Sequence, residues 1–102
     1  MTHEFDLNQL VGDLKGDDEY WKSFIEKPGF ELGVLVLAPH QEDTQSPHSS
    51  DEVYFVISGD GYLRINETEF TIKPNTAYYV PKDTPHHFHS NSKEIIAYYA
   101  LN

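Results

Sequence analysis

Short runs of β-branched and aromatic residues, separated by turn-forming residues, fill the chain from Phe30 onward. Such runs are typical of β-strands, because branched and aromatic side chains pack well on a pleated surface. The predicted strands are Glu31–Leu37, Glu52–Ile57, Tyr62–Asn66, Glu69–Lys73, Ala77–Val80, His86–Ser90 and Glu94–Leu101. Glycine, proline and asparagine mark the breaks between them. Short strands at regular spacing, with no helix between them, predict an all-β antiparallel sandwich or barrel.

The N-terminal part of the chain has a helical pattern instead. Apolar residues recur at helical spacing in two groups, first Leu7, Leu10, Val11 and Leu14, and then Tyr20, Trp21, Phe24 and Ile25. Asp17 and Asp18 precede the second group as candidate caps of a second helix, and Pro28-Gly29 ends it. We therefore expect a short helical N-terminal arm over residues 1–29 and a β-barrel over residues 30–102, within a single domain.

Several predicted strands are apolar or aromatic on both faces, as in Val34–Ala38, Val53–Ile57 and Ala97–Leu101. An antiparallel strand with one solvent-exposed face should alternate between apolar and polar residues. Because these strands do not, both of their faces are expected to be covered. The arm can cover one patch, and a second copy of the chain would cover the rest, which predicts a homodimer. The alternative is that half-exposed tyrosines, of which the chain has seven, merely blur the alternation.

Composition narrows the classes of partner and chemistry. The chain has 102 residues, no cysteine and a formal net charge of −10, with Arg64 as its only arginine. Thiolate ligands and disulfides are therefore excluded, and the shortage of basic residues argues against nucleic acid as a partner. The longest apolar run, Val34–Ala38, is too short to span a bilayer, and Met1–Asp6 lacks the features of a signal peptide. A soluble, cytoplasmic protein that does not contact a membrane is expected.

Two histidines and one carboxylate are the candidate chemical groups. His48 lies four residues before Glu52, at the start of a predicted strand, and His86 opens another predicted strand. On their strands Glu52 shares a face with Tyr54, and His86 shares a face with Phe88. Neutral imidazole and carboxylate hold first-row divalent metals, and two His with one carboxylate leave coordination positions open. The set predicts a metal site.

The spacing of these residues resembles the paired motifs of the cupin superfamily. The first family motif reads Gly, five residues, His-x-His, three or four residues, Glu, six residues, Gly, and this chain matches it at His48, Glu52 and Gly59. The second reads Gly, five residues, Pro-x-Gly-x-x-His, three residues, Asn, and the matches are Pro81 and His86. The resemblance implies an antiparallel double-stranded β-helix, the jelly-roll cupin barrel.

Five positions depart from the family pattern. His40, Ser46, Asn75, Asp83 and Ser90 stand where the family has Gly, His, Gly, Gly and Asn. His, Asn and Asp are the non-glycine residues that most readily adopt positive φ, so the three glycine replacements are compatible with the same turns. Ser46 is a chemical change, because a neutral hydroxyl is a poor ligand for a divalent metal.

The resemblance further implies a divalent transition metal, with Fe, Mn, Ni, Zn and Co left open, and a small-molecule ligand or substrate. Gln45, one residue before Ser46, carries an amide oxygen and is a fourth candidate ligand beside His48, Glu52 and His86. Members of the superfamily include dioxygenases, isomerases and lyases, which makes a metal-dependent enzyme the first functional hypothesis. The alternative is a non-catalytic or regulatory module that binds a sugar-like or aromatic ligand, with or without metal.

Overall fold

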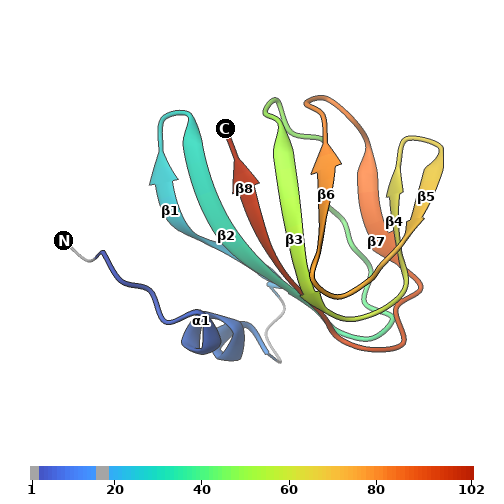
Figure 1. Cartoon of the computed structure of the whole chain (residues 1–102), viewed down its shortest axis with the longest axis horizontal. Coiled ribbons are helices and arrows are strands. Elements are labelled where there is room, and N and C mark those ends of the chain that lie inside the picture. The colour runs from blue at the N-terminus through green and yellow to red at the C-terminus, as the bar shows by residue number, and fades with distance from the viewer. Residues whose placement is uncertain (1–2, 16–18) are drawn as a thin grey trace.

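The computed structural model describes residues 3–15 and 19–102, which form one helix and eight strands (Figure 1). The elements are α1 (Leu7–Leu14), β1 (Trp21–Lys27), β2 (Phe30–Leu37), β3 (Glu52–Ser58), β4 (Tyr62–Ile65), β5 (Thr68–Thr71), β6 (Thr76–Val80), β7 (His86–His89) and β8 (Ile95–Leu101). From β2 onward these bounds agree with the predicted strands to within one or two residues at each end.

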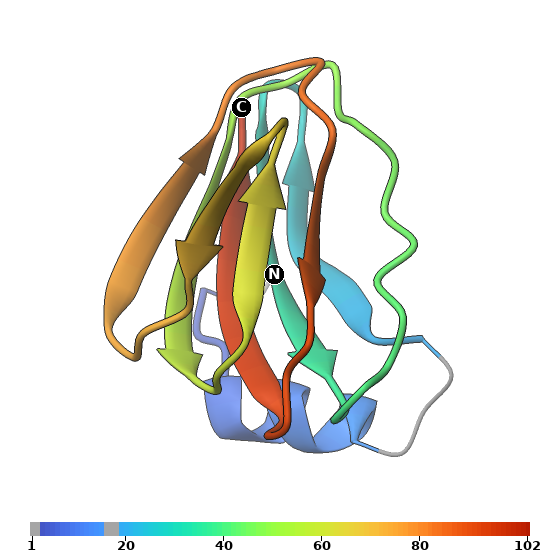
Figure 2. The same ribbon diagram turned by 90° about the vertical axis from the view of Figure 1, so that its right-hand side faces the viewer.

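The strands form two antiparallel sheets that pack against each other. One sheet has the order β1-β2-β8-β3-β6, and the other has the order β5-β4-β7 (Figure 2). Large buried side chains from both sheets, including Leu35, Tyr54, Leu63, Phe88 and Ile95, fill the space between them. The predicted all-β antiparallel fold is therefore confirmed, and its core lies between the two sheets.

The predicted second helix over Tyr20–Ile25 is wrong, because this segment contributes strand β1, which pairs with β2 at the edge of the larger sheet. The pairing register shifts between Ser23 and Ile25, which leaves Phe24 as an extra residue. A bulged strand carries neighbouring apolar residues, and this spacing imitates a helical period. Within the predicted helical arm 1–29, only Leu7–Leu14 is helical among the described residues, and Asp17 and Asp18, the candidate caps, lie outside them.

Helix α1 covers part of the outer face of the larger sheet. Its first turn is capped by the Asp6 side chain, which accepts a hydrogen bond from the Gln9 backbone N–H at 3.2 Å. The face of the helix that is turned toward the sheet buries Val11 and Leu14 against Val34 and Val36 of β2. These four residues form a second apolar cluster. Among the described residues, no helix has the length and apolar character needed to cross a bilayer. The cytoplasmic location stays a prediction.

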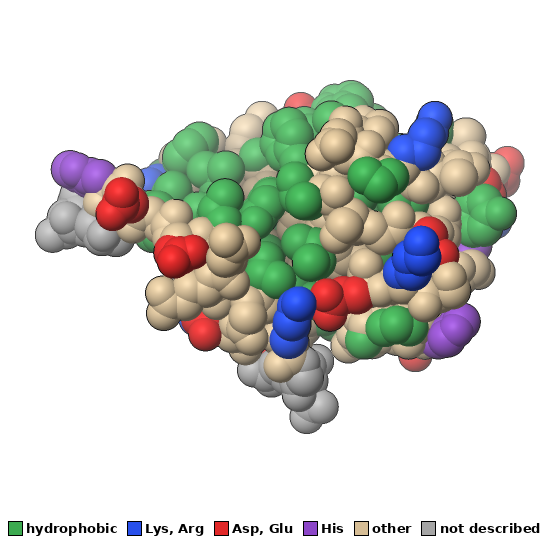
Figure 3. Space-filling model, turned by 60° about the horizontal axis from the view of Figure 1, so that its bottom comes forward, with side chains coloured by type: hydrophobic (Ala, Val, Ile, Leu, Met, Phe, Trp, Pro, Cys, Tyr) green, Lys and Arg blue, Asp and Glu red, His purple; other side chains and the backbone are tan. Residues whose placement is uncertain are grey.

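The rest of that outer face is apolar and exposed. Partners in the strand register place Leu32, Ala100, Val53 and Tyr79 in one row across β2, β8, β3 and β6. Tyr79 is 58% exposed. Phe55, which is two residues after Val53 on β3 and lies on the same face, is 46% exposed. Figure 3 shows hydrophobic side chains gathered in the middle of the face seen from below in Figure 1, with charged side chains mostly around them. The predicted homodimer is consistent with such a face and stays a prediction.

The three residues that replace family glycines adopt the backbone conformation expected of them. His40, Asn75 and Asp83 have φ values of 60°, 57° and 58°. Each donates its backbone N–H to a distant carbonyl: His40 to Asn91 at 3.0 Å, Asn75 to Val56 at 2.8 Å, and Asp83 to His48 at 2.6 Å. The prediction that these turns are retained is confirmed, and the last of these bonds ties the His48 segment to the turn before β7.

Candidate functional site

The two sheets and one loop each supply one residue of the candidate site. Glu52 opens β3 in the larger sheet and is 2% exposed, while His86 opens β7 in the smaller sheet and is 5% exposed. His48 comes from the loop between β2 and β3 and is half-buried. Tyr54 follows Glu52 on the inner face of β3, as the strand pattern predicted. His87, next to His86, is exposed, so His86 is the inward histidine of this pair.

The donor atoms of the three residues converge. Nε2 of His86 lies 3.2 Å from Oε1 of Glu52, and Nε2 of His48 lies 3.6 Å from the same oxygen. All three donor atoms lie within 4.8 Å of one another, a grouping from which a metal ion could be held. Two ligands about 2.1 Å from one ion are separated by about 3.0 Å when they are at right angles, and by about 3.4 Å in a tetrahedron. The contact between His86 and Glu52, at 3.2 Å, falls within that range, and the contact between His48 and Glu52, at 3.6 Å, lies just above it.

Two of these donor atoms lack a partner of their own. His48 Nε2 and Glu52 Oε1 are buried, and no hydrogen bond to the rest of the described chain satisfies either of them. His86 Nε2 lies 3.2 Å from Oε1 without forming a hydrogen bond to it, and its hydrogen-bond partner is the Tyr54 hydroxyl, 3.1 Å away. A buried polar atom without a partner costs about 1–3 kcal/mol. A cation between these atoms would satisfy both, so the residues present fit a divalent metal.

The backbone carbonyl of Thr84 fixes the orientation of the His86 ring. Its Nδ1 lies 2.8 Å from the carbonyl oxygen of Thr84, and since a carbonyl can only accept, Nδ1 carries the proton. In the neutral ring Nε2, which faces Glu52, carries the lone pair with which an imidazole ligates a metal. Burial alone would lower the pKa of His86, but the Glu52 carboxylate and the Thr84 carbonyl together raise it above its ordinary value.

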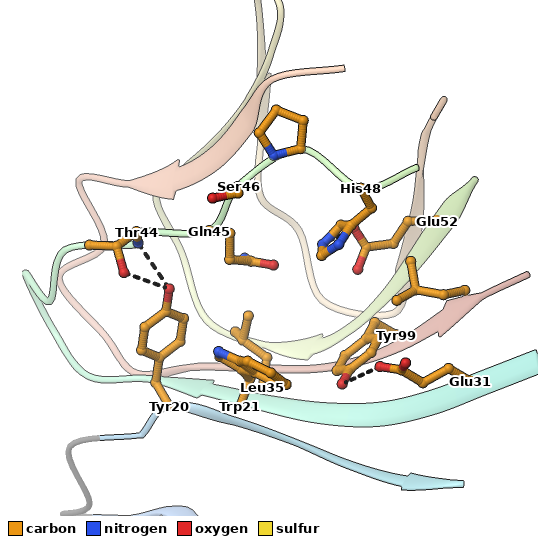
Figure 4. A pocket seen from close by; sticks show the side chains of 12 residues that line it. Tyr20, Trp21, Glu31, Leu35, Thr44, Gln45, Ser46, His48, Glu52 and Tyr99 are labelled. Atoms are coloured by element: carbon orange, nitrogen blue, oxygen red, sulfur yellow. Dashed lines mark hydrogen bonds and ion pairs between the residues drawn. The ribbon is translucent and has the colours of Figure 1, made fainter. Parts of the chain in front are cut away.

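The loop before His48 points Gln45 inward and Ser46 outward. Gln45 Oε1 accepts a hydrogen bond from the Tyr54 hydroxyl at 2.9 Å, whereas Ser46 is exposed. Figure 4 shows the Gln45 side chain directed toward His48 and Glu52, and the Ser46 hydroxyl directed away from them. In this conformation Gln45, not Ser46, faces the candidate site. A role for Gln45 as a metal ligand stays a prediction.

Tyr54 joins this group of polar residues to the core. Its ring packs edge-on against Phe88 with centroids 4.9 Å apart, and its hydroxyl lies between Gln45 and His86. Burial, followed by the negative charge of Glu52, raises the pKa of Tyr54 well above its ordinary value. The hydroxyl therefore stays protonated and serves as a hydrogen-bond donor inside the barrel.

Asp43 holds the loop in place, and the sequence analysis missed it. Its carboxylate accepts hydrogen bonds from the Phe88 backbone N–H at 2.8 Å, the Tyr20 hydroxyl at 2.9 Å and the Gln45 side-chain amide at 3.0 Å. These bonds attach the β2–β3 loop to β7. Asp43 sits in the polar run Gln41–Gln45, and nothing in that run distinguishes it from a solvated loop residue.

A cavity of about 450 Å³ adjoins two of the three candidate ligands, His48 and Glu52 (Figure 4). His48 and Glu52 form part of its wall, and the rest comes in about equal parts from β1, β2 and β8 and from Tyr20 and the loop residues Thr44–Pro47. The wall from these strands includes Trp21, Glu31, Leu35, Tyr99 and Leu101. The site therefore combines convergent metal-binding groups with a partly aromatic space of a size suited to a small organic ligand.

Comparisons with known proteins agree with this architecture. A family model described as the cupin domain matches residues 33–101. The uncharacterized protein SCO3923 of Streptomyces coelicolor is 29% identical over 91 residues, which cover 89% of this chain and 87% of that protein.

Solved structures are similar in fold. The structure of TT1209 from Thermus thermophilus has a TM-score of 0.79 and 20% identity, and the match covers 98% of this chain and 96% of that one. The cupin domain of Cnp3 from Schizosaccharomyces pombe has a TM-score of 0.71 and 21% identity over 79% of this chain, which spans 61% of that structure. At these identities the likeness establishes the fold alone, and it confirms the predicted jelly-roll barrel.

Proposed function

The chain belongs to the cupin family, and on that premise we propose that it binds a divalent transition metal through His48, Glu52 and His86 and acts on a small molecule in the adjoining cavity. The observation that carries the proposal is the pair of buried, unsatisfied donor atoms, His48 Nε2 and Glu52 Oε1. Both belong to the same three-residue group, and an ion bound there would satisfy them together.

The protein's own residues have separable roles in this proposal. Two imidazoles and one carboxylate, from His48, His86 and Glu52, would hold an ion with coordination positions left open, and the ion would supply Lewis-acid chemistry toward an oxygen of a bound molecule. Glu52 supplies the negative charge, and the Thr84 carbonyl fixes the ring orientation of His86. The Tyr54 hydroxyl, held protonated, donates a hydrogen bond beside the ligands. A dioxygenase, isomerase or lyase would use these groups in different ways.

Metal analysis of protein purified without chelators tests the proposal. We expect one equivalent of metal per chain, and titration with Fe(II), Mn(II), Ni(II), Zn(II) and Co(II) would rank the ions. His86→Ala and Glu52→Gln should each weaken binding tenfold or more, by analogy with losses of about 10–100-fold for supporting residues of metal sites. His87→Ala is the matched control, because His87 is the neighbouring histidine on β7 and is exposed. Equal metal affinity in the His86 and His87 variants would refute the assignment.

A metal-free binding module is the second candidate, and one contact favours it. The Tyr54 hydroxyl lies 3.1 Å from His86 Nε2, so this nitrogen has a partner within the protein. In that case Glu52 and His48 would hydrogen-bond the ligand directly. Ligand affinity that is unchanged by complete removal of metal, in protein that purifies without bound metal, would support the module over the metal-dependent function.

A further inference from the structure

The wall of the cavity formed by β1, β2 and β8 carries negative charge and aromatic surface. Glu31 from β2, Tyr99 from β8 and Trp21 from β1 line it together, and Figure 4 shows their side chains on the β-sheet side of the space, across from Gln45 and His48. The Tyr99 hydroxyl donates a hydrogen bond to Glu31 Oε2 at 3.2 Å. The cavity lining contains no lysine or arginine among the described residues.

The Tyr99–Glu31 pair is held in place by the strand register. Gly33 is the partner of Tyr99 across the β2–β8 ladder, and it leaves room for the ring, since a Cβ on Gly33 would lie 2.1 Å from Cζ of Tyr99. Burial and the neighbouring Glu31 charge raise the pKa of Tyr99. Its hydroxyl therefore remains a donor, and it occupies only part of the accepting capacity of the Glu31 carboxylate.

A second acidic residue lies beside this pair. Glu26 on β1 is the direct register partner of Glu31 on β2, so the two carboxylates start from the same face of neighbouring strands. Like charges at directly opposite positions repel, and neither carboxylate forms an ion pair with another described residue. Serine and tyrosine hydroxyls, from Ser23 and Tyr99, are their hydrogen-bond partners. Glu26 is exposed and does not line the cavity, so of the two carboxylates only Glu31 faces a molecule bound there, and a cation beside Glu31 would reduce this repulsion.

We propose that this wall is an ammonium-binding subsite, formed by Glu31, Tyr99 and Trp21, which selects small organic amines with an oxygen donor at the opposite end. The Glu31 carboxylate attracts the ammonium group, and the indole of Trp21 adds a face for cation–π contact. The oxygen donor would face His48 and Glu52, so the second half of the ligand class rests on the proposed metal-dependent function. A ligand with an anionic far end would meet Glu31 and be disfavoured.

The fluorescence of Trp21 reports ligand binding at this wall directly, because Trp21 is the only tryptophan in the chain. Its fluorescence is followed during titration with aminohexanol, hexanediol and hydroxyhexanoate, which share a chain length and a terminal hydroxyl and differ in the charge of the far end. At constant ionic strength the amine should bind about tenfold more tightly than the diol, which corresponds to about 1.4 kcal/mol, and the carboxylate should bind most weakly. The series is run on metal-loaded protein and on protein stripped of metal.

Two charge-matched variants separate the subsite from the net charge. Glu31→Gln should abolish the preference for the amine and leave the diol affinity unchanged, whereas Glu67→Gln removes the same charge from an exposed turn and should leave the order intact. Equal affinities for amine and carboxylate in the wild type, or an amine preference that survives Glu31→Gln, would overturn the subsite. If the protein fails to bind any of the metals and still prefers the amine, the subsite is supported and the metal-dependent function is overturned.

Discussion

The contact between Gly33 and Tyr99 allows a test of the barrel's inner wall by the smallest possible side-chain addition. In Gly33→Ala the new Cβ would lie 2.1 Å from Cζ of Tyr99 and 2.3 Å from Cε2 and Oη. The ring cannot stay at these distances, and although one side of it borders the cavity it is only 5% exposed. We expect Tyr99 to leave its position and to lose its hydrogen bond to Glu31.

Three contributions determine how far Gly33→Ala lowers the free energy of unfolding. Overpacking a filled interior typically costs about 1–3 kcal/mol. The lost hydrogen bond adds about 0.5–1.5 kcal/mol. Replacing glycine by alanine at a position without strain returns about 0.4–1 kcal/mol through the unfolded state, and Gly33 does not have a positive φ. The net destabilisation is about 2 kcal/mol, or a fall of about 8–16 °C in Tm for a domain of this size.

Urea denaturation of four proteins in a double-mutant cycle measures this coupling: the wild type, Gly33→Ala, Tyr99→Ala and the double variant. Without the ring, Gly33→Ala has nothing to displace, so in the Tyr99→Ala background it should be neutral or stabilising by about 0.5 kcal/mol. The two backgrounds should therefore differ by about 2 kcal/mol or more. The same destabilisation by Gly33→Ala in both backgrounds would refute the packing of Tyr99 against Gly33.

Three further predictions concern the candidate site and the outer sheet. Because the pKa of His86 is raised above its ordinary value of about 6.5, a metal must displace a proton from this ring even somewhat above that pH, and metal affinity should fall steadily as the pH drops through it. Metal affinity that stays constant down to about pH 4 would contradict histidine ligation. Gln45→His should tighten metal binding and Ser46→His should not, since only position 45 faces the site; calorimetric titration with Zn(II) distinguishes them, and the reverse order would contradict the loop conformation. The predicted homodimer should be seen by light scattering at micromolar concentration, and Phe55→Glu should convert it to monomer; a wild-type monomer would contradict it.

The fold was predictable because its signals are local and repeated. From β2 onward, each strand is a short β-rich run that ends at a turn residue, and a turn restricts the backbone whatever the tertiary context. His40, Asn75 and Asp83 illustrate the point, since their side chains differ from glycine and yet their positive φ values keep the turns. Glu52 and His86 were predictable for a related reason, because alternation along a strand fixes which residues face the core.

The errors occurred where alternation fails. In β1 the extra residue Phe24 disturbs the period of two, and the resulting pattern imitated a helix. In the loop before β3 no period exists, so motif spacing could align Ser46 with a family histidine but could not show which side chain points inward, and the chain path turns Gln45 inward. The path depends on Asp43, whose hydrogen bonds reach Tyr20 and Phe88, and contacts over such sequence distances are not encoded in a local pattern.

The position of Tyr54 explains how one small interior can hold both a core and a polar site. Its ring packs on Phe88 in the apolar core, while its hydroxyl reaches Gln45 and lies 3.1 Å from His86. Glu52, two residues earlier on the same strand face, lies at the polar end of that row. Because strand residues of one face are fixed relative to each other, the packing of the Tyr54 ring also fixes the height of the Glu52 carboxylate. The geometry of the candidate ligands is thus set by the core beneath them as well as by the loop that carries His48.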